Sequence, residues 1–322
     1  MKAIRVHAPG GTEALVYEDV PDPQPKPGEA VVRVEAAGVN FIDVYFRTGL
    51  YKAAMPLTLG QEGAGTVAAV APDVTGVAPG DRVAWYGAFG SYAGRAAVPA
   101  ARLVKLPADV SARQGAAVML QGMTAHYLAT STYPLKPGDT CVVHAGAGGV
   151  GLLLTQIAKL RGARVLATVS NAEKARLSRE AGADLTVDYT TQDFEAEARR
   201  FTDGRGVQVV YDSVGRTTFE KGLASLAVRG MMVLFGQSSG PVAPLDPQVL
   251  SQRGSLYLTR PTLFNYTVSR EELLARAGDV LGWVRDGRLK LRLEHDFPLS
   301  EAAAAHAALE GRRTTGKVLL IP

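Results

Sequence analysis

The sequence predicts an α/β protein in which a β-rich region precedes a doubly wound sheet of parallel strands. Two observations support this prediction. Residues 1 to about 123 contain runs in which apolar and polar side chains alternate, which is typical of half-buried strands. From about residue 125 to 287, apolar strand-like runs alternate with helical segments. Such alternation indicates a parallel sheet whose strands are joined by crossover helices.

The N-terminal region is expected to form strands at 31–36 and 65–70, separated by turns rich in proline, glycine and aspartate. Ser111 and Gln114 have the spacing of a capping box, which predicts the start of a short helix.

The middle region is expected to supply six strands, enough for a complete doubly wound sheet. A second capping box, Ser269 with Glu272, predicts a long helix that ends near Gly287. The six strands are expected at 140–145, 165–169, 183–188, 207–212, 231–236 and 255–259.

The C-terminal segment returns to a strand–helix–strand pattern. An alanine-rich helix capped by Ser300 is expected between short strands at 297–299 and 317–321. We expect this tail to pack back on the first domain. The predicted domains are therefore 1–123 with 288–322, and 124–287.

A glycine-rich turn between the first strand and the first helix of the middle region predicts a dinucleotide site. Gly146, Gly148 and Gly151 fit the pattern G-x-G-x-x-G. The first glycine allows the tight turn, the second lets the backbone approach a pyrophosphate, and the third lets the helix pack closely on its strand. The free N–H groups at the helix N-terminus would bind the phosphates.

The end of the second strand favours NADP(H) over NAD(H). An NAD site usually has an Asp or Glu at this point, about 20 residues past the glycines, to bind the ribose 2′-hydroxyl. Here the strand ends in Ser170 and Asn171, and Lys174 follows one helical turn later. A strand end that has a nearby cation and lacks a carboxylate is suited to bind the 2′-phosphate of NADP(H). Ser170 and Glu173 are also expected to form a capping box for the helix beginning at Ala172.

The composition excludes or disfavours several classes of protein, including disulfide-bonded, zinc-binding and membrane-spanning ones. The 322 residues can form two domains, and the net charge is +4. Cys141 is the single cysteine, which excludes an internal disulfide and disfavours a cysteine-based zinc site. The five histidines show no metal-ligand spacing, so no metal is predicted. We expect no signal peptide, no membrane span and a cytoplasmic location.

Several motifs together resemble the zinc-independent quinone oxidoreductase branch of the medium-chain dehydrogenase/reductase superfamily, which includes zeta-crystallin. The most discriminating is Gly60-Gln61-Glu62, since zinc alcohol dehydrogenases carry Gly-His-Glu there. The resemblance implies a GroES-like β-rich catalytic domain and a Rossmann domain. The other matching motifs are 38–43, 81–84, 121–125, 144–151, 211–215 and 259–261.

The resemblance also implies an NADPH:quinone oxidoreductase without zinc. Because no Lewis acid would polarise the substrate, an electron-poor acceptor such as a quinone is expected, bound in the cleft between the domains. The implied acceptor-site residues are Asn40, Asp43, Tyr45, Tyr51 and Gln61. Asn40 and the two tyrosines are expected to donate hydrogen bonds to a quinone oxygen as negative charge develops.

The cofactor residues implied by the resemblance follow the ends of the parallel strands. Tyr127 would contact the cofactor, and Gly149 and Val150 would lie under the pyrophosphate. The remaining implied residues are Ser170, Lys174 and Tyr189 around the 2′-phosphate, Ser213 near the adenosine, Phe235, Gly236, Gln237, Ser238, Thr259, Arg260 and Pro261 on the nicotinamide side, and Arg313 as a further cation.

The resemblance further implies a homodimer that forms through the sheet edge at 255–259. Two other functions stay open. One is NADPH-dependent reduction of the carbon–carbon double bond of an enal or enone, which needs similar hydride geometry. The other is NADPH-gated RNA binding, although the sequence contains no RNA-binding module or concentrated basic stripe.

Overall fold

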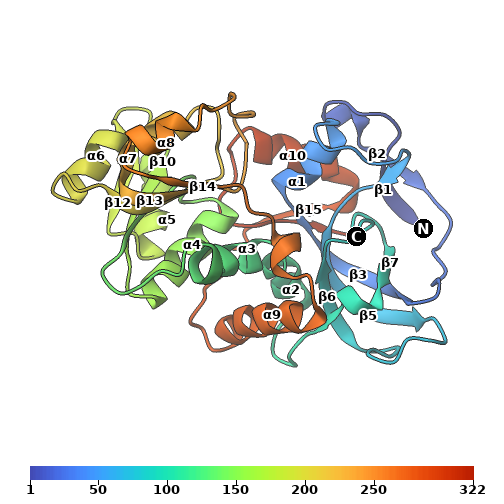
Figure 1. The fold of residues 1–322 in the computed structure, drawn as a ribbon. Coiled ribbons are helices and arrows are strands. Elements are labelled where there is room, and N and C mark those ends of the chain that lie inside the picture. The colour runs from blue at the N-terminus through green and yellow to red at the C-terminus, as the bar shows by residue number, and fades with distance from the viewer. The chain divides into compact units, whose positions relative to one another are not determined.

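A computed structural model describes all 322 residues, and the chain divides into two compact units (Figure 1). The β-rich unit contains Met1–Met123 and Thr267–Pro322, and the α/β unit contains Thr124–Tyr266. The predicted fold class is confirmed. The second boundary differs from the expected one, because residues 267–287 belong to the β-rich unit and not to the sheet that precedes them.

Tertiary contacts explain this difference. Helix α9 (Arg270–Arg285) packs against α2 (Ala112–Val118) of the β-rich unit. The Arg270 guanidinium donates to the Ala101 carbonyl at 2.8 Å. The order of elements along the chain assigned α9 to the sheet it follows, whereas in the structure α9 packs against α2 of the β-rich unit.

The β-rich unit is built around one long strand, β3 (Glu29–Val39). β5 (Glu62–Val70) pairs with β3 along one edge. β7 (Arg95–Pro99) and β16 (Val318–Ile321) pair with its beginning and its end along the other. The C-terminal strand therefore completes a sheet that the N-terminal residues begin.

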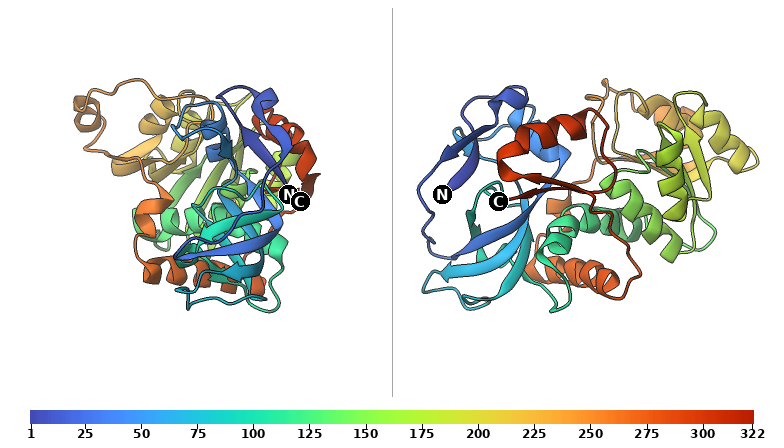
Figure 2. Two further views of the ribbon diagram at one scale, coloured as in Figure 1. Left: turned by 90° about the vertical axis from the view of Figure 1, so that its right-hand side faces the viewer. Right: turned by 180° about the vertical axis from the view of Figure 1, so that it is seen from behind.

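The remaining elements of this unit flank that sheet. In Figure 2, α10 lies beside α1. A smaller sheet has the order β2-β1-β4, and β15-β16-β3-β5-β6-β8 is the order of the main one. The remaining bounds are β1 Lys2–Val6, β2 Val16–Asp19, α1 Phe41–Arg47, β4 Leu57–Thr58, β6 Arg82–Tyr86, β8 Val104–Lys105, β15 His295–Pro298 and α10 Ala302–Glu310.

The α/β unit contains six parallel strands in the order β11-β10-β9-β12-β13-β14. The order reverses between β9 and β12, which makes this the place where an open α/β sheet binds its ligand. α4 and α5 contact each other, and α6 and α7 contact each other. The strands are β9 Thr140–Val143, β10 Arg164–Val169, β11 Leu185–Asp188, β12 Val207–Asp212, β13 Leu226–Leu234 and β14 Tyr257–Thr259.

Helices of this unit pack on an apolar core. Val142, Leu166 and Val210 on one face of the sheet pack with Phe194 of α6 and Leu223 of α7. Helix α3, at Gln121–Tyr127, includes the boundary between the units. The other helices are α4 Gly149–Leu160, α5 Ala172–Glu180, α6 Phe194–Phe201, α7 Phe219–Ser225 and α8 Gln248–Gln252. None of the helices has both the length and the apolar composition that a membrane span needs.

Candidate functional site

The glycine turn has the geometry that a phosphate site needs. Gly148 is the N-cap of α4, so the first N–H groups of this helix have no partner within the helix. A Cβ on Gly151 would lie 2.3 Å from the carbonyl oxygen of Ala145. Ala145 itself has a φ of 52°, in the left-handed region. Only glycine at 151 lets the helix begin this close to the strand, which presents its N–H groups at the switch point.

The end of β10 has a cation and no carboxylate. The Lys174 ammonium donates to Ser170 Oγ at 3.2 Å. Asn171, and not Ser170, is the N-cap of α5, because its Oδ1 accepts from the Lys174 backbone N–H at 2.9 Å. The predicted Ser170–Glu173 capping box is therefore wrong. The Ser170 hydroxyl instead accepts a hydrogen bond from the Lys174 ammonium.

Tyr189 follows the neighbouring strand, β11. Its backbone N–H donates to the Val169 carbonyl at 3.1 Å, which ties it to the end of β10. Its side chain is 39% exposed. Ser170, Lys174 and Tyr189 thus all lie at the ends of β10 and β11.

The loops after β12 and β13 contact each other through their backbones. The buried Asp212 carboxylate accepts from the backbone N–H groups of Val214 and Gly215, at 2.7 and 3.0 Å. A Cβ on Gly236 would lie 2.6 Å from the Ser213 carbonyl oxygen, so the two loops touch through backbone. The Ser238 N–H also donates to Ser213. Asp212 fixes the loop that carries Ser213, a role that the sequence analysis missed.

The other cofactor candidates in this unit lie at or after the ends of β13 and β14, except Tyr127, which is the last residue of α3. Tyr127 is buried and stacks on Tyr266, with ring centroids 4.2 Å apart. Phe235 and Gln237 follow β13, and 260–261 follow β14. Arg313 belongs to the β-rich unit, so its contribution to a cofactor site stays a prediction.

In the β-rich unit, the acceptor-site candidates Asn40 and Asp43 prove to be buried at the junction of β3 and α1. Asn40 is the N-cap of α1, and its backbone N–H donates to Asp43 Oδ2 at 2.9 Å. Its amide donates to Glu62 Oε2 at 2.8 Å and to the Gly38 carbonyl at 3.2 Å. Both amide hydrogens are therefore in use, and the expected donation to a quinone would require one of these bonds to break.

Asp43 is fully buried and receives a hydrogen bond from Tyr92 Oη at 3.1 Å. Tyr92 in turn lies 3.1 Å from His306 Nε2, and Arg47 donates to His306 Nδ1 at 3.1 Å. Since arginine only donates, His306 carries its proton on Nε2 and donates to Tyr92. Burial raises the pKa of Asp43 to about 7 and lowers the pKa of His306 to about 3. A directed chain of donors therefore ends on Asp43.

The other three acceptor-site candidates have different surroundings. Tyr45 is 9% exposed and packs edge-on against Tyr51 at 5.2 Å. Gln61 is 3% exposed, and its backbone carbonyl accepts from Gly87. The structure also adds residues that the sequence analysis did not assign to the site, namely Glu62, Gln121 and Lys317. Lys317 gave no local signal, because it lies 277 positions from Asn40.

No group of three or more histidine, cysteine, aspartate or glutamate side chains is arranged to hold a metal ion. Cys141 is buried in β9, and burial raises the pKa of its thiol.

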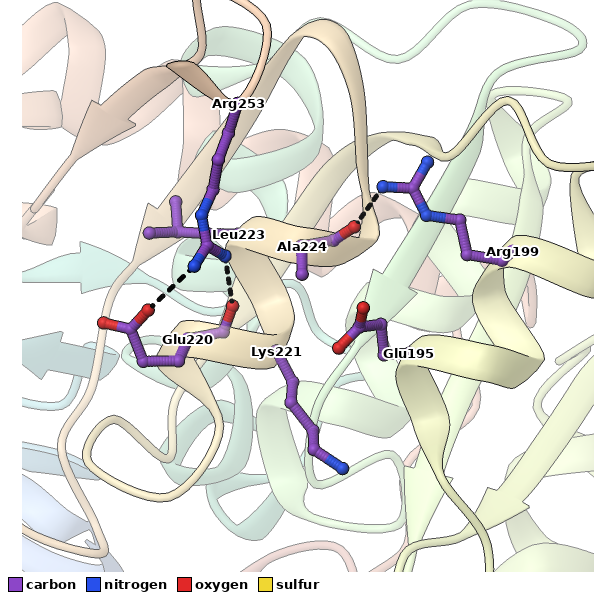
Figure 3. A pocket seen from close by; sticks show the side chains of 7 residues that line it. All are labelled: Glu195, Arg199, Glu220, Lys221, Leu223, Ala224 and Arg253. Atoms are coloured by element: carbon purple, nitrogen blue, oxygen red, sulfur yellow. Dashed lines mark hydrogen bonds and ion pairs between the residues drawn. The ribbon is translucent and has the colours of Figure 1, made fainter. Parts of the chain in front are cut away.

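A separate hollow lies between α6, α7 and the end of α8 (Figure 3). Four of its charged side chains already have partners. Arg253 donates to Glu220 at 3.1 and 3.4 Å, Arg199 donates to the Ala224 carbonyl, and Lys221 pairs with Asp193 at 2.7 Å. It contains none of the predicted site residues. The lining residues are Glu195, Arg199, Glu220, Lys221, Leu223, Ala224 and Arg253.

Comparison with known proteins gives consistent matches over the whole chain. Residues 26–108 match the alcohol dehydrogenase GroES-like domain, and residues 149–276 match the zinc-binding dehydrogenase family. A quinone oxidoreductase of Pseudomonas aeruginosa is 46% identical over 323 residues, covering 100% of this chain and 99% of that protein.

Two further similarities concern cofactor and substrate. The structure of a mycobacterial protein in complex with NADPH is 49% identical, with a TM-score of 0.98 and 100% of both chains covered. A 2-haloacrylate reductase of a Burkholderia species is 40% identical over 325 residues, covering 98% of each protein.

Proposed function

The chain belongs to the quinone oxidoreductase family of the medium-chain dehydrogenase/reductase superfamily, and from this membership we propose how its residues use NADPH to reduce a small quinone. The protein is an oxidoreductase, and bound NADPH supplies the hydride. The observation that carries the assignment of NADPH as the cofactor is the Lys174–Ser170 contact at the end of β10. No carboxylate stands at that strand end to bind a ribose 2′-hydroxyl, as one would in an NAD site.

We assign the cofactor's charged groups to two helix N-termini. The free N–H groups at the start of α4, on Gly149 and Val150, bind the pyrophosphate. Lys174, Ser170 and Tyr189 bind the 2′-phosphate beside the N-terminus of α5. These residues suit the phosphate groups of the cofactor, because each site offers hydrogen-bond donors or positive charge to phosphate oxygens.

We assign the acceptor to the region around α1. Tyr45 and Tyr51 stand edge to face and have hydroxyls able to donate to a quinone oxygen as negative charge develops on it. Asn40, Asp43 and Gln61 support that region from its buried side. Positioning and exclusion of water are then the main contributions of these residues.

A second candidate function is reduction of an activated carbon–carbon double bond. The similarity to a 2-haloacrylate reductase favours it, because that protein is named for an alkene substrate. In both reactions the substrate accepts hydride at an electron-poor carbon or oxygen. The fold therefore does not distinguish the two candidate functions.

The test is steady-state oxidation of NADPH and of NADH with a benzoquinone, a larger polycyclic quinone, an enal and a simple ketone, in the presence of a metal chelator. We expect chelator-resistant, NADPH-specific turnover of the quinones. Turnover of the enal alone would favour the second function. Absence of turnover with every acceptor would overturn both.

We also propose that two copies of the chain pair through β14. This strand is the last in its sheet, and its exposed residues are apolar: Tyr257 is 58% and Leu258 is 38% exposed. Val228 of the neighbouring β13 is 71% exposed. An uncovered apolar edge strand is a template for pairing, and a second copy would cover it.

A further inference from the structure

Two opposite charges surround the carboxamide of Asn40. The Lys317 ammonium donates to Asn40 Oδ1 at 3.0 Å, and the Asn40 amide nitrogen donates to the Glu62 carboxylate at 2.8 Å. Lys317 and Glu62 also form an ion pair, and both side chains are at most 3% exposed. A Cβ on Gly38 would lie 2.3 Å from Glu62 Oε2, so glycine is needed for the pair to form.

These charges leave Asn40 a single orientation. An ammonium only donates hydrogen bonds and a carboxylate only accepts them. Rotating the amide by half a turn would set its NH₂ against the ammonium and its oxygen against the carboxylate. The oxygen of Asn40 must therefore face Lys317.

The orientation of Asn40 decides that of Gln121. Gln121 Nε2 donates to Asn40 Oδ1 at 3.0 Å, so the oxygen of Gln121 points elsewhere. That oxygen, Oε1, is buried and has no hydrogen-bond partner, in a residue that is itself only 9% exposed. An unpaired buried acceptor is energetically costly. A hydrogen-bond donor placed against this oxygen would supply the missing partner.

We propose that Gln121 Oε1 accepts a hydrogen bond from the hydroxyl of the reduced acceptor, a hydroquinone, and that Lys317 and Glu62 are positioning residues that keep this oxygen, rather than the amide hydrogens, available. This inference rests on the proposed quinone reduction. In that reaction a hydride from NADPH and a proton from water convert the two carbonyl oxygens of the quinone into two hydroxyls, while NADP⁺ is formed.

The chemistry explains why an acceptor oxygen is useful at this place. A quinone has only acceptor oxygens and gains nothing from Gln121 Oε1, whereas its reduced form has O–H donors. The interaction therefore strengthens as the hydroxyl forms, which stabilises the later part of the reaction selectively. An alkene reduced at carbon forms no hydroxyl there, so Gln121 would favour quinones over enals.

The experiment compares equilibrium binding of 1,4-hydroquinone and its dimethyl ether by calorimetry without oxygen. We expect the wild type to prefer the hydroquinone, and Gln121→Met to lower the ratio of the two affinities about fivefold. Size differences between the ligands cancel in this double comparison. Gln24→Met, at an exposed loop position, is the matched control and should leave the ratio unchanged.

The positioning role is tested with the double variant Lys317→Met, Glu62→Gln, which removes both charges together so that no unpaired charge stays buried. We expect a lower hydroquinone-to-ether ratio with unchanged affinity for NADPH and an unchanged circular-dichroism spectrum. Lys105→Met, which breaks the surface ion pair with Asp81, is the control and should change neither affinity.

Two results would overturn the inference: no preference for the hydroquinone in the wild type, or a wild-type ratio in folded Gln121→Met, whether or not its NADPH affinity changes. Because binding is measured without turnover, these results are distinct from a failure of quinone reduction in the steady-state assay.

Discussion

At the scale of single residues, Asp43 combines full burial with a structural task. Its carboxylate accepts from the backbone of Asn40 and from Tyr92, which holds the first turn of α1. Burial raises its pKa to about 7, although the hydrogen bonds and the Lys317 charge act in the opposite direction. The folded protein therefore keeps a proton on Asp43 at pH values where the unfolded chain has released it.

This proton makes stability depend on pH. Between the ordinary carboxyl pKa and about 7, the folded state binds more protons than the unfolded state, so the free energy of unfolding falls as pH rises. Asp43→Asn, a neutral isostere, should remove a decline on the order of a few kcal/mol between pH 5 and pH 8. Urea unfolding at both pH values measures it, and the same decline in variant and wild type would contradict this role of Asp43.

Lys174 decides the choice of cofactor in our assignment. Lys174→Ala should raise the KM for NADPH about tenfold, because a charge-assisted bond to the 2′-phosphate is lost, and leave the KM for NADH unchanged. Lys221→Ala, which breaks an exposed ion pair with Asp193 on the same unit, is the control. An equal rise for both cofactors would place the effect of Lys174 outside phosphate recognition. Steady-state kinetics with each cofactor provide the comparison.

At the scale of elements, α4 depends on the absence of a side chain at its third residue. Because a Cβ on Gly151 would meet the Ala145 carbonyl oxygen at 2.3 Å, backbone would have to move. We expect Gly151→Ala to destabilise the protein by about 1–3 kcal/mol and to weaken NADPH binding. Thermal unfolding and NADPH titration measure the two effects.

Gly278 of α9 is the matched control for this substitution. It is an exposed helix position, and a Cβ there would meet no heavy atom within 4 Å. Gly278→Ala should stabilise the protein by about 0.5–1 kcal/mol, because alanine loses less backbone entropy in a helix. Equal effects of the two glycine substitutions would show that close packing at Gly151 is unimportant.

At the scale of the whole molecule, pairing of two chains follows from the exposed edge of the α/β unit. Leu258→Lys would place like charges at the pairing strand, and we expect it to convert a dimer into monomers in analytical ultracentrifugation. Val16→Lys, at an exposed position of the edge strand β2 in the other unit, should leave the dimer intact. A monomeric wild type, or a Leu258→Lys dimer of wild-type stability, would contradict this interface.

The sequence predicted the features that depend on local spacing. Six strands, the Ser111–Gln114 and Ser269–Glu272 capping boxes and the glycine turn occur in the structure close to the predicted positions. Where two local patterns competed, prediction was weaker. Asn171 replaced Ser170 as the cap of α5, and Glu301 precedes α10 in place of the expected Ser300.

By itself, the sequence therefore determined the fold class, the order of the elements and the phosphate-binding turn, because periodicity, caps and glycine spacing act over a few residues. Only the tertiary structure decided that α9 packs with the β-rich unit and that Lys317, Glu62 and Gln121 surround Asn40. Lys317 reaches Asn40 because β16 pairs with the end of β3. Such contacts join residues that are distant along the chain, and no local pattern specifies which buried charge will meet which amide.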